Sequence, residues 1–465
     1  MKKRYIIETF GCQMNVHDSE RMAGLLEREG YALAASPEQA DLVVLHTCSV
    51  RERAEEKLYS RLGELALIDR PGGGRPTVAV SGCVAQQQGE LIRRRSPVID
   101  VVVGTHRLKR LPDLVEQAAR TGAPVVDVNP YEDVSFPLGV VRHGDPVRAY
   151  VTVIEGCNDY CAFCVVPYTR GPERMRRVAD ILAETRQAVE SGRREVHLLG
   201  QIVNHYRAPD DPACDFAELL ARVNDIEGVA RIRFASPHPR HVTPRLIEAL
   251  RDLPRVCKHL HLPVQSGSTR VLAAMRRRHT RQQYLELVAR LRLAVPDLAL
   301  STDMIAGFPG ETAADFAETL SLVSHVRFNS MFSFKYSVRP NTLASKRLVD
   351  DVPEAEKSRR IVALQALQRE VQVGLHRQAV GRTVEVLVDA PSRKRAWELQ
   401  GRTSGNTVVN FPGPAVWVGR FLPIHITEAW PNALRGECRQ QLTGLHPAPT
   451  LPETPGRARR VTDAD

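Results

Sequence analysis

The sequence has no run of eighteen uncharged apolar residues, the length that a membrane-spanning helix needs. Its first residues, MKKRYIIETFGCQMN, carry basic charge but lack the apolar core of a signal peptide. We therefore expect a cytoplasmic protein with no membrane contact. Cysteines seldom form disulfides in that reducing compartment, so grouped cysteines are better candidates for metal ligands or reactive thiols. Repeats of the solenoid type are also absent.

The size and charge of the chain set wide limits. Its 465 residues, 43% hydrophobic and 25% charged, are typical of a folded chain with two or three domains. The net charge of +10 comes mostly from an excess of arginine, which binds phosphate well and favours a nucleic-acid partner. An ordinary surface in an arginine-rich genome explains the same charge, so composition alone leaves both interpretations open.

Alternating apolar runs and amphipathic segments divide the first three quarters of the chain. Residues 1–120 contain RYIIETF, ADLVVLHT, TVAVSG and VIDVVVG, a pattern typical of a parallel α/β sheet. Residues 121–146 are rich in Pro, Gly and Asp and predict a linker. Residues 147–375 form a second domain, which repeats the alternation up to about residue 335 with AYVTVI, EVHLL, RIRFA, HLHL, LALSTDMI and SMFSF. This pattern predicts an open (β/α)6 partial barrel. A long helix over residues 353–378 follows it.

The end of the chain has a different pattern. Residues 376–438 contain TVEVLVD, AWELQGRT, NTVVNF and FLPIHITEA, which predict a small β-barrel. Residues 439–465 are dominated by Pro, Thr, Arg and Asp and predict a disordered tail. The expected fold class is therefore α/β, with a parallel N-terminal α/β domain, a central partial barrel and a small C-terminal β-barrel.

One group of cysteines lies in the segment EGCNDYCAFCVVPYTRG, directly after the strand AYVTVI. Cys157, Cys161 and Cys164 are separated there by three and then two residues. Three thiolates on one tight loop can hold three irons of a cubane cluster, and the fourth iron is left open to a small chelating molecule. S-adenosylmethionine has the amine and carboxylate for that position. The alternatives are cysteines that only pack, or a zinc site that lacks one ligand.

A second group of cysteines is spread through the first domain. Cys12, Cys48 and Cys83 each end one predicted parallel strand. Because the carboxyl ends of neighbouring parallel strands share one edge of the sheet, these thiols can converge on a second cluster site. The alternative is three small buried hydrophobic residues. The remaining cysteines match no ligand motif: Cys214, Cys257 and Cys438.

The cysteine loop resembles that of the radical SAM superfamily. The phrases TFGCQMN, TCSVRERAEEK, GCVAQQ, HLPVQSGS, IAGFPGET and GRTSGNTVVNF resemble its methylthiotransferase branch over nearly the whole chain. The resemblance implies a central barrel of radical SAM type, two [4Fe-4S] clusters and S-adenosylmethionine. It also implies that Phe163 lies against the adenine of that cofactor. Further cofactor contacts are expected at Gly200, Gln201, Gly307 and Gly310, where glycine either permits close backbone approach or only forms a turn.

The resemblance also implies a reaction and its partners. The expected reaction is methylthiolation of the adenine ring of N6-isopentenyladenosine next to the anticodon in tRNA, by radical chemistry with sulfur insertion and methyl transfer. Gln13 and Met14 favour this substrate over threonylcarbamoyladenosine in tRNA or an aspartate of a ribosomal protein. No catalytic residue is expected beyond the cluster ligands. We also expect a reduced electron donor of flavodoxin or ferredoxin type, and a monomer. An iron–sulfur regulator that binds RNA without catalysis is the alternative from another class.

Some positions depart from the family pattern. His46, Ile202 and Pro237 replace the usual residues of their motifs, and the resemblance gives them no role. The last barrel resembles a TRAM domain, an RNA-binding module whose basic residues would meet phosphates. Taken singly, such residues are more often solvated surface. The basic residues of this module are Arg382, Arg393, Lys394, Arg395, Arg402 and Arg420.

Overall fold

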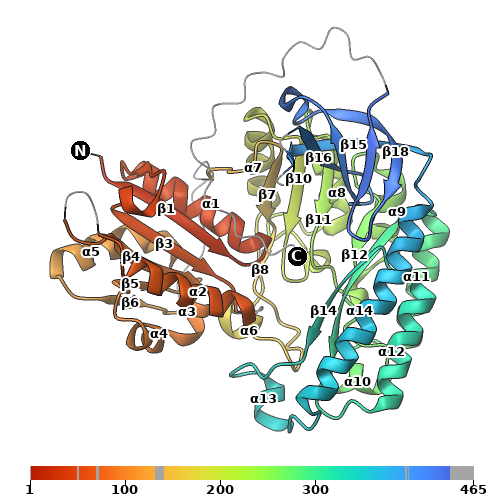
Figure 1. Cartoon of the computed structure of the whole chain (residues 1–465), viewed down its shortest axis with the longest axis horizontal. Coiled ribbons are helices and arrows are strands. Elements are labelled where there is room, and N and C mark those ends of the chain that lie inside the picture. The colour runs from red at the N-terminus through yellow and green to blue at the C-terminus, as the bar shows by residue number, and fades with distance from the viewer. Residues whose placement is uncertain are drawn as a thin grey trace.

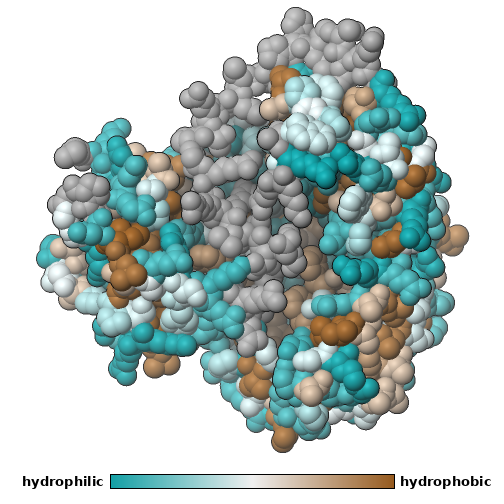
Figure 2. Space-filling model, viewed as in Figure 1, coloured by the Kyte–Doolittle hydropathy of each residue, from teal (hydrophilic) through white to brown (hydrophobic). Residues whose placement is uncertain are grey.

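The computed structural model describes residues 2–49, 52–69, 73–130, 141–392, 395 and 397–439. An N-terminal sheet domain, a central barrel domain and a small C-terminal barrel lie side by side (Figure 1). The face seen in Figure 2 is mostly hydrophilic with scattered apolar patches, as expected when the apolar runs lie inside. Within the ranges given above, no helix has the length and apolar character to span a membrane. The predicted tail lies outside the described residues from 440 onward.

The N-terminal domain is built on one parallel sheet. The four predicted runs are all strands, and the structure adds two very short ones at the edges. One of them, Val125–Asp127, pairs with its neighbour inside the segment that we expected to be a linker, so the sheet extends beyond residue 120. Three residues are too few to show an apolar period. In spatial order the strands are β2 (Ala32–Leu33), β1 (Arg4–Phe10), β3 (Leu42–Thr47), β4 (Thr77–Gly82), β5 (Val101–Val103) and β6 (Val125–Asp127).

Helices cover both faces of this sheet, which is why its central strand β3 is buried along its whole length. Alternate residues of each strand face opposite cores: Ile6 and Val43 lie in one, Tyr5 and Leu42 in the other. The helices are α1 (Gln13–Arg28), α2 (Glu52–Leu65), α3 (Cys83–Gln88), α4 (Glu90–Arg95) and α5 (Leu111–Thr121).

The central domain is the predicted open barrel. Its six parallel strands form two three-stranded sheets, which a single bridge between Ile232 and Val256 joins. Within the part of the chain that the structure describes, the first and last strands do not pair, so the barrel stays open. The strands follow chain order: β7 (Arg148–Thr152), β10 (Glu195–Leu199), β11 (Arg231–Phe234), β12 (His259–His261), β13 (Ala299–Ala306) and β14 (Ser330–Lys335).

Helices wrap the outside of the barrel. Several of them begin at a polar cap; Thr280 and Thr312 form capping boxes with Gln283 and Asp315. The predicted long helix is α14. After β7 the chain forms a short strand, β8 (Ile154–Glu155), which pairs antiparallel with β9 (Arg174–Met175). The helices are α6 (Val166–Thr169), α7 (Val178–Glu190), α8 (Phe216–Asn224), α9 (Pro244–Asp252), α10 (Thr269–Ala274), α11 (Arg281–Ala294), α12 (Ala313–Val326), α13 (Leu343–Arg347) and α14 (Glu354–Arg377). Short 3-10 turns lie at Pro37–Gln39, Leu108–Arg110, Val203–His205, Pro239–His241 and Ala415–Trp417.

The C-terminal module is a closed five-stranded barrel around an apolar core that includes Val386, Val409 and Ile424. The sequence missed its last strand, which has only four residues. In order around the barrel the strands are β15 (Thr383–Pro391), β16 (Glu398–Arg402), β17 (Val408–Pro412), β19 (Leu434–Glu437) and β18 (Phe421–Ala429).

This module docks at the amino ends of the central strands. Arg231, the first residue of β11, donates a hydrogen bond to the Arg402 carbonyl at 2.6 Å. Arg233 donates to the Thr403 carbonyl at 2.7 Å. The carboxyl ends of the strands, where the chemistry of such barrels takes place, therefore remain free of the C-terminal module.

Candidate active site

The first trio of thiols converges as the strand pattern predicts. Cys12, Cys48 and Cys83 follow β1, β3 and β4, which are neighbours in the sheet. The Cys48 thiol is hydrogen-bonded to the thiols of both Cys12 and Cys83. Cys48 and Cys83 are buried, whereas Cys12 is exposed. The structure thus gathers residues more than thirty positions apart into one sulfur-rich site.

Two glycines allow this close approach. A Cβ atom on Gly11 would lie 2.7 Å from Cys48 Cβ, and one on Gly82 would lie 2.3 Å from the Thr47 carbonyl oxygen. Gly82 also has a φ of +96°, which side chains rarely adopt. The sequence signal of this close approach is the Gly that precedes Cys in both TFGC and VSGC.

The outer thiols of the trio are biased toward the thiolate. The hydrogen bond with Cys48 lowers the pKa of Cys12 and of Cys83, and the Arg170 cation adds to this effect. Burial of Cys83 acts in the opposite sense. The same two neighbours raise the pKa of Cys48 well above its ordinary value. Thiolates are the form in which cysteine binds metals.

A buried polar network lies beside the trio. Arg170 donates a hydrogen bond to Asp18 at 2.6 Å, and His46 Nε2 lies 3.7 Å from the same carboxylate oxygen. The Nδ1 atom of His46 lies 2.7 Å from Ser81 Oγ. His46, one of the three departures from the family pattern, is therefore part of the surroundings of the trio, because it also acts electrostatically on Cys83.

The other trio lies on the loop after β8 and consists of Cys157, Cys161 and Cys164. Cys164 N donates to the Cys161 carbonyl at 3.0 Å, and Ala162 N donates to the Met275 carbonyl at 2.9 Å, so the loop is fixed. Burial raises the pKa of Cys157 and Cys164 to about 12, and the neighbouring Cys161 adds to it. Arg277 Nη1 lies 3.6 Å from Cys161 Sγ and supplies a nearby positive charge.

Unpartnered polar atoms surround this loop. Four of these atoms are buried and have no hydrogen-bond partner among the residues that the structure describes: Gln201 Oε1, His238 Nε2, Arg277 Nε and His279 Nε2. Because buried polar atoms are nearly always satisfied, these atoms fit a polar cofactor or substrate. Phe163 packs beside them in an apolar cluster that contains Phe308.

The donor set suits an iron–sulfur cluster. Among the described residues, no three Cys, His, Asp or Glu side chains meet closely enough to chelate a single metal ion. Each trio offers thiols, the ligands that iron–sulfur clusters take. The residues present therefore fit the expected group.

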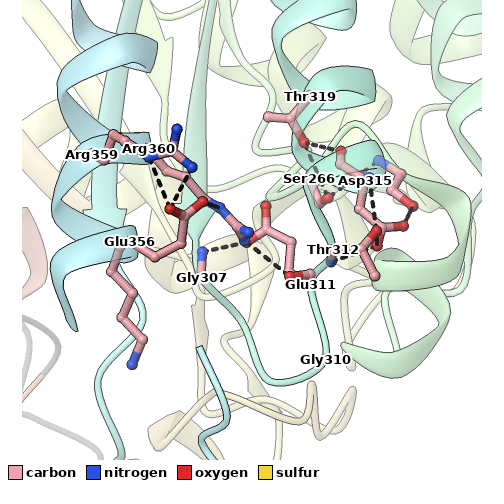
Figure 3. A network of polar contacts seen from close by, with 12 residues as sticks. Ser266, Gly307, Gly310, Glu311, Thr312, Asp315, Thr319, Glu356, Arg359 and Arg360 are labelled. Carbon is pink, nitrogen blue, oxygen red and sulfur yellow. Dashed lines mark hydrogen bonds and ion pairs between the residues drawn. The ribbon is translucent and has the colours of Figure 1, made fainter. Parts of the chain in front are cut away.

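The loop that contains Gly307 and Gly310 follows β13, and a hydrogen bond from α14 holds it in place (Figure 3). The Gly307 amide donates to the Glu311 carboxylate, and Arg360 of α14 donates to the Glu311 carbonyl at 3.0 Å. A Cβ atom on Gly307 would lie 2.4 Å from Lys357 Cγ, and φ is +75°. Packing and turn geometry alone thus require this glycine. Its contact with the cofactor stays a prediction.

The turn at Gly200 has a similar local cause. A Cβ atom there would lie 3.1 Å from Val203 Cα, inside the turn that follows β10. A Cβ atom on Gly310 would make only an ordinary contact with Arg270 Nη1 at 4.0 Å, but φ is +77°. All four expected contacts outside the cysteine loop lie at the carboxyl ends of β10 and β13, as predicted.

The N-terminal domain reaches the mouth of the barrel through α1. Met14 packs with Tyr150 and Leu199, and its Sδ atom lies 2.6 Å from Gln201 Nε2. Arg21 pairs with Glu155 at 2.9 Å, close to the second cysteine loop. Both cysteine trios therefore border one interface between the two domains. From the sequence, Met14 was expected only to favour one substrate, and its place in the domain interface was not predicted.

The basic residues of the C-terminal module have different surroundings. Arg402 lies 3.5 Å from Asp389 in the docking interface, and Arg395 pairs with Glu398 at 3.0 Å. Arg382 is exposed and Arg420 is half-buried. Arg393 and Lys394 lie outside the described residues. Arg402 therefore contributes to docking.

Three family models match separate parts of the chain. Residues 4–104 match the Uncharacterized protein family UPF0004, residues 151–323 the Radical SAM superfamily and residues 377–438 the TRAM domain. The solved radical S-adenosylmethionine methyltransferase TsrM from Kitasatospora setae shares the fold, with a TM-score of 0.54 and 13% identity over 82% of this chain and 79% of its own. The fold and the cysteine loop thus define a radical SAM enzyme, the class that uses a [4Fe-4S] cluster and S-adenosylmethionine.

Curated relatives narrow the class to one family. The tRNA-2-methylthio-N(6)-dimethylallyladenosine synthase of Haemophilus influenzae strain Rd is 43% identical over 99% of this chain and 98% of its own. The synthase of the same name from Methylococcus capsulatus is 46% identical over 94% and 95%. The one from Yersinia enterocolitica is 45% identical over 94% and 92%. The chain belongs to this family of tRNA methylthiotransferases.

Proposed function

We propose that the protein adds a methylthio group to the adenine ring of N6-isopentenyladenosine next to the anticodon in tRNA. The observation that carries the proposal is the meeting of two cysteine trios at one domain interface. Relatives that share at least 43% identity over nearly the whole chain carry the corresponding synthase name. A tRNA substrate also agrees with the TRAM match.

Each trio has its own task in this proposal. Cys157, Cys161 and Cys164 hold the cluster that binds S-adenosylmethionine, and Cys12, Cys48 and Cys83 hold a second [4Fe-4S] cluster. When bound, these groups supply the radical chemistry and the methylated sulfur that an inert ring C–H bond requires. The cysteines contribute rigid placement, because one trio is fixed at three strand ends and the other on a hydrogen-bonded loop.

Buried side chains at the carboxyl ends of the barrel strands orient what binds there. His238 Nδ1 accepts a hydrogen bond from the Arg240 amide at 3.1 Å, so its Nε2 carries the proton and can donate. His279 Nδ1 donates to the Arg277 carbonyl at 3.0 Å, so its Nε2 can accept. Burial lowers the pKa of both rings, which keeps them neutral. The pair thus offers one donor and one acceptor to a polar ligand.

The apolar side of the site excludes water. Phe163 packs with Phe308, whose ring lies 5.2 Å from that of Tyr336 in a T-shaped arrangement. A dry wall beside the cysteine loop protects radical chemistry from side reactions. We keep Phe163 as the side chain that contacts the cofactor adenine, together with Gln201 as a polar contact.

The C-terminal barrel contributes to RNA binding in this proposal. Trp397 is 55% exposed, and the guanidinium groups of Arg395 and Arg435 lie 5.8 and 5.7 Å from its ring centre. An exposed aromatic ring flanked by cations suits an unstacked base and its phosphate. A reduced donor of flavodoxin or ferredoxin type supplies electrons, and the enzyme acts as a cytoplasmic monomer.

The decisive experiment uses anaerobically reconstituted protein with S-adenosylmethionine, reductant and tRNA that carries isopentenyladenosine. Mass spectrometry of the digested RNA should show the methylthio nucleoside. Deoxyadenosine without that nucleoside would keep the radical SAM class and move the substrate to threonylcarbamoyladenosine or to the ribosomal protein. Absence of both products would contradict the proposed reaction.

A further inference from the structure

Arg170 belongs to the barrel domain but acts at the thiol trio of the other domain. It follows α6, six residues after Cys164, and its guanidinium donates to Asp18 of α1 at 2.6 Å. Both side chains are buried, with 7% and 2% of their surface exposed. The segment that carries the loop cysteines Cys157, Cys161 and Cys164 thus inserts a cation beside the N-terminal trio.

The backbone around Arg170 is held on both sides. Arg170 N donates to the Val166 carbonyl at 2.8 Å, and the following Gly171 carbonyl accepts from Cys157 N at 3.1 Å. Thr105 of the N-terminal domain donates its hydroxyl to the Thr169 carbonyl. Contacts of the cysteine loop itself therefore hold the backbone that carries Arg170.

Packing places Arg170 beside the thiol trio. The helix before it, α6, packs against α3, which begins at Cys83, and its partner Asp18 lies on α1, the helix that follows Cys12. His46 Nε2 lies 3.7 Å from the same Asp18 oxygen. Asp18 balances this one cation, whereas a cluster on three thiolates brings additional negative charge into a buried site. A fixed cation close to such a cluster favours its reduced form, because reduction adds another negative charge.

We propose that Arg170 is a positioning residue of the barrel domain that sets the electrostatic environment of the Cys12, Cys48 and Cys83 cluster. The reduction potential of that cluster then depends on docking of the two domains. This inference rests on the proposed function, since it requires that the N-terminal trio holds a cluster.

The test uses the full-length chain with Cys157, Cys161 and Cys164 replaced by Ala, so that only the N-terminal cluster contributes. Iron and sulfide are counted, and the midpoint potential is measured by redox titration with EPR detection. Arg170→Gln should shift the potential to a more negative value, and Arg170→Lys should restore most of it. Asp18→Asn should shift it the opposite way, because it removes a negative charge and keeps the cation.

A matched control separates charge from docking. Arg21→Gln removes another buried arginine of the same interface, one that pairs with Glu155 at 2.9 Å. Its potential should stay close to that of the parent. Equal shifts in Arg21→Gln and Arg170→Gln would show that loose docking causes the effect, and would overturn the inference.

The remaining outcomes are also decisive. An Arg170→Gln protein that keeps its iron and its potential overturns the inference. If that variant fails to fold or to hold iron, Asp18→Asn decides: a less negative potential supports the inference, and an unchanged potential rejects it. If the parent protein binds no iron at the N-terminal trio, the result contradicts the proposed function, which assigns a cluster to Cys12, Cys48 and Cys83.

Discussion

The Nδ1 atom of His17 lies 2.7 Å from the Oγ1 atom of Thr152, which ties α1 of the N-terminal domain to β7 of the barrel. The Nε2 atom of the same ring lies 3.0 Å from Glu184. The neutral ring satisfies both partners when Thr152 donates to Nδ1 and Nε2 donates to Glu184. The interface that both cysteine trios border is thus polar and specific.

This interface predicts a pH dependence of stability. Burial, together with Arg21, lowers the pKa of His17 below its ordinary value of 6.5, although Glu184 acts in the opposite sense. The unfolded chain therefore binds a proton more readily than the folded one, and the free energy of unfolding should fall as pH drops below about 6.5. Urea unfolding of the iron-free protein between pH 8 and pH 5.5 measures this.

The matched variant for that experiment is His17→Asn, which removes the titrating ring. Its free energy of unfolding should be lower at pH 8, and its dependence on pH should be weaker than in the parent. Parallel curves for the two proteins would show that His17 does not contribute to the pH dependence.

The division of labour between the trios predicts different defects. Cys157→Ala should abolish cleavage of S-adenosylmethionine, whereas Cys48→Ala should leave some cleavage and yield no methylthio product. The reason is that only Cys157 belongs to the loop whose cluster leaves one iron open to S-adenosylmethionine. Deoxyadenosine and the modified nucleoside are quantified in the same reaction. Cys214→Ala, a buried cysteine outside both trios, should retain both products. Equal loss of cleavage in the two ligand variants would contradict this division.

The close approach at Gly82 predicts a large effect of one methyl group. Gly82→Ala should destabilise the iron-free protein by about 1–3 kcal/mol, because its φ of +96° and the Thr47 carbonyl leave no room for Cβ. The variant should also bind less iron at the N-terminal trio. Gly63→Ala is the control, since no atom of the described residues lies within 4 Å of the added Cβ on this helical residue. It should raise stability by roughly 0.5–1 kcal/mol. Urea unfolding compares the two, and similar losses in both would refute the steric explanation.

The exposed tryptophan of the C-terminal barrel predicts an RNA contact. Trp397→Ala should weaken tRNA binding by about 1–3 kcal/mol, the usual contribution of one base stacked on an aromatic ring. Trp430→Ala removes a similarly exposed ring, whose Nε1 atom donates a hydrogen bond to Glu428 at 3.2 Å. This variant should bind tRNA like the parent. Binding isotherms at one fixed salt concentration make the comparison valid. Equal affinities for parent and Trp397→Ala would remove this residue from the RNA interface.

Much of the fold could be predicted because its elements carry strong local patterns. The run LVVLHT is buried along its whole length, which is why an uninterrupted apolar segment indicated a central parallel strand. The expected fold class is confirmed. The edge strands β2 and β6 and the closing strand β19 were missed, because AL, VVD and LRGE are short and do not lie in a longer run of branched apolar residues. The equally short strand β5 was predicted, because it lies in the run VIDVVVG.

The sequence by itself determined the chemistry, because the thiols of Cys157, Cys161 and Cys164 are neighbours on one loop and the N-terminal cysteines end adjacent strands. Their roles as cluster ligands stay predictions. Only the tertiary structure placed Arg170 beside Asp18, 152 residues away, and Met14 at the mouth of the barrel. Such contacts depend on how two separately folded domains dock. No local spacing or periodicity encodes that geometry, since it follows from shape and charge complementarity between distant surfaces.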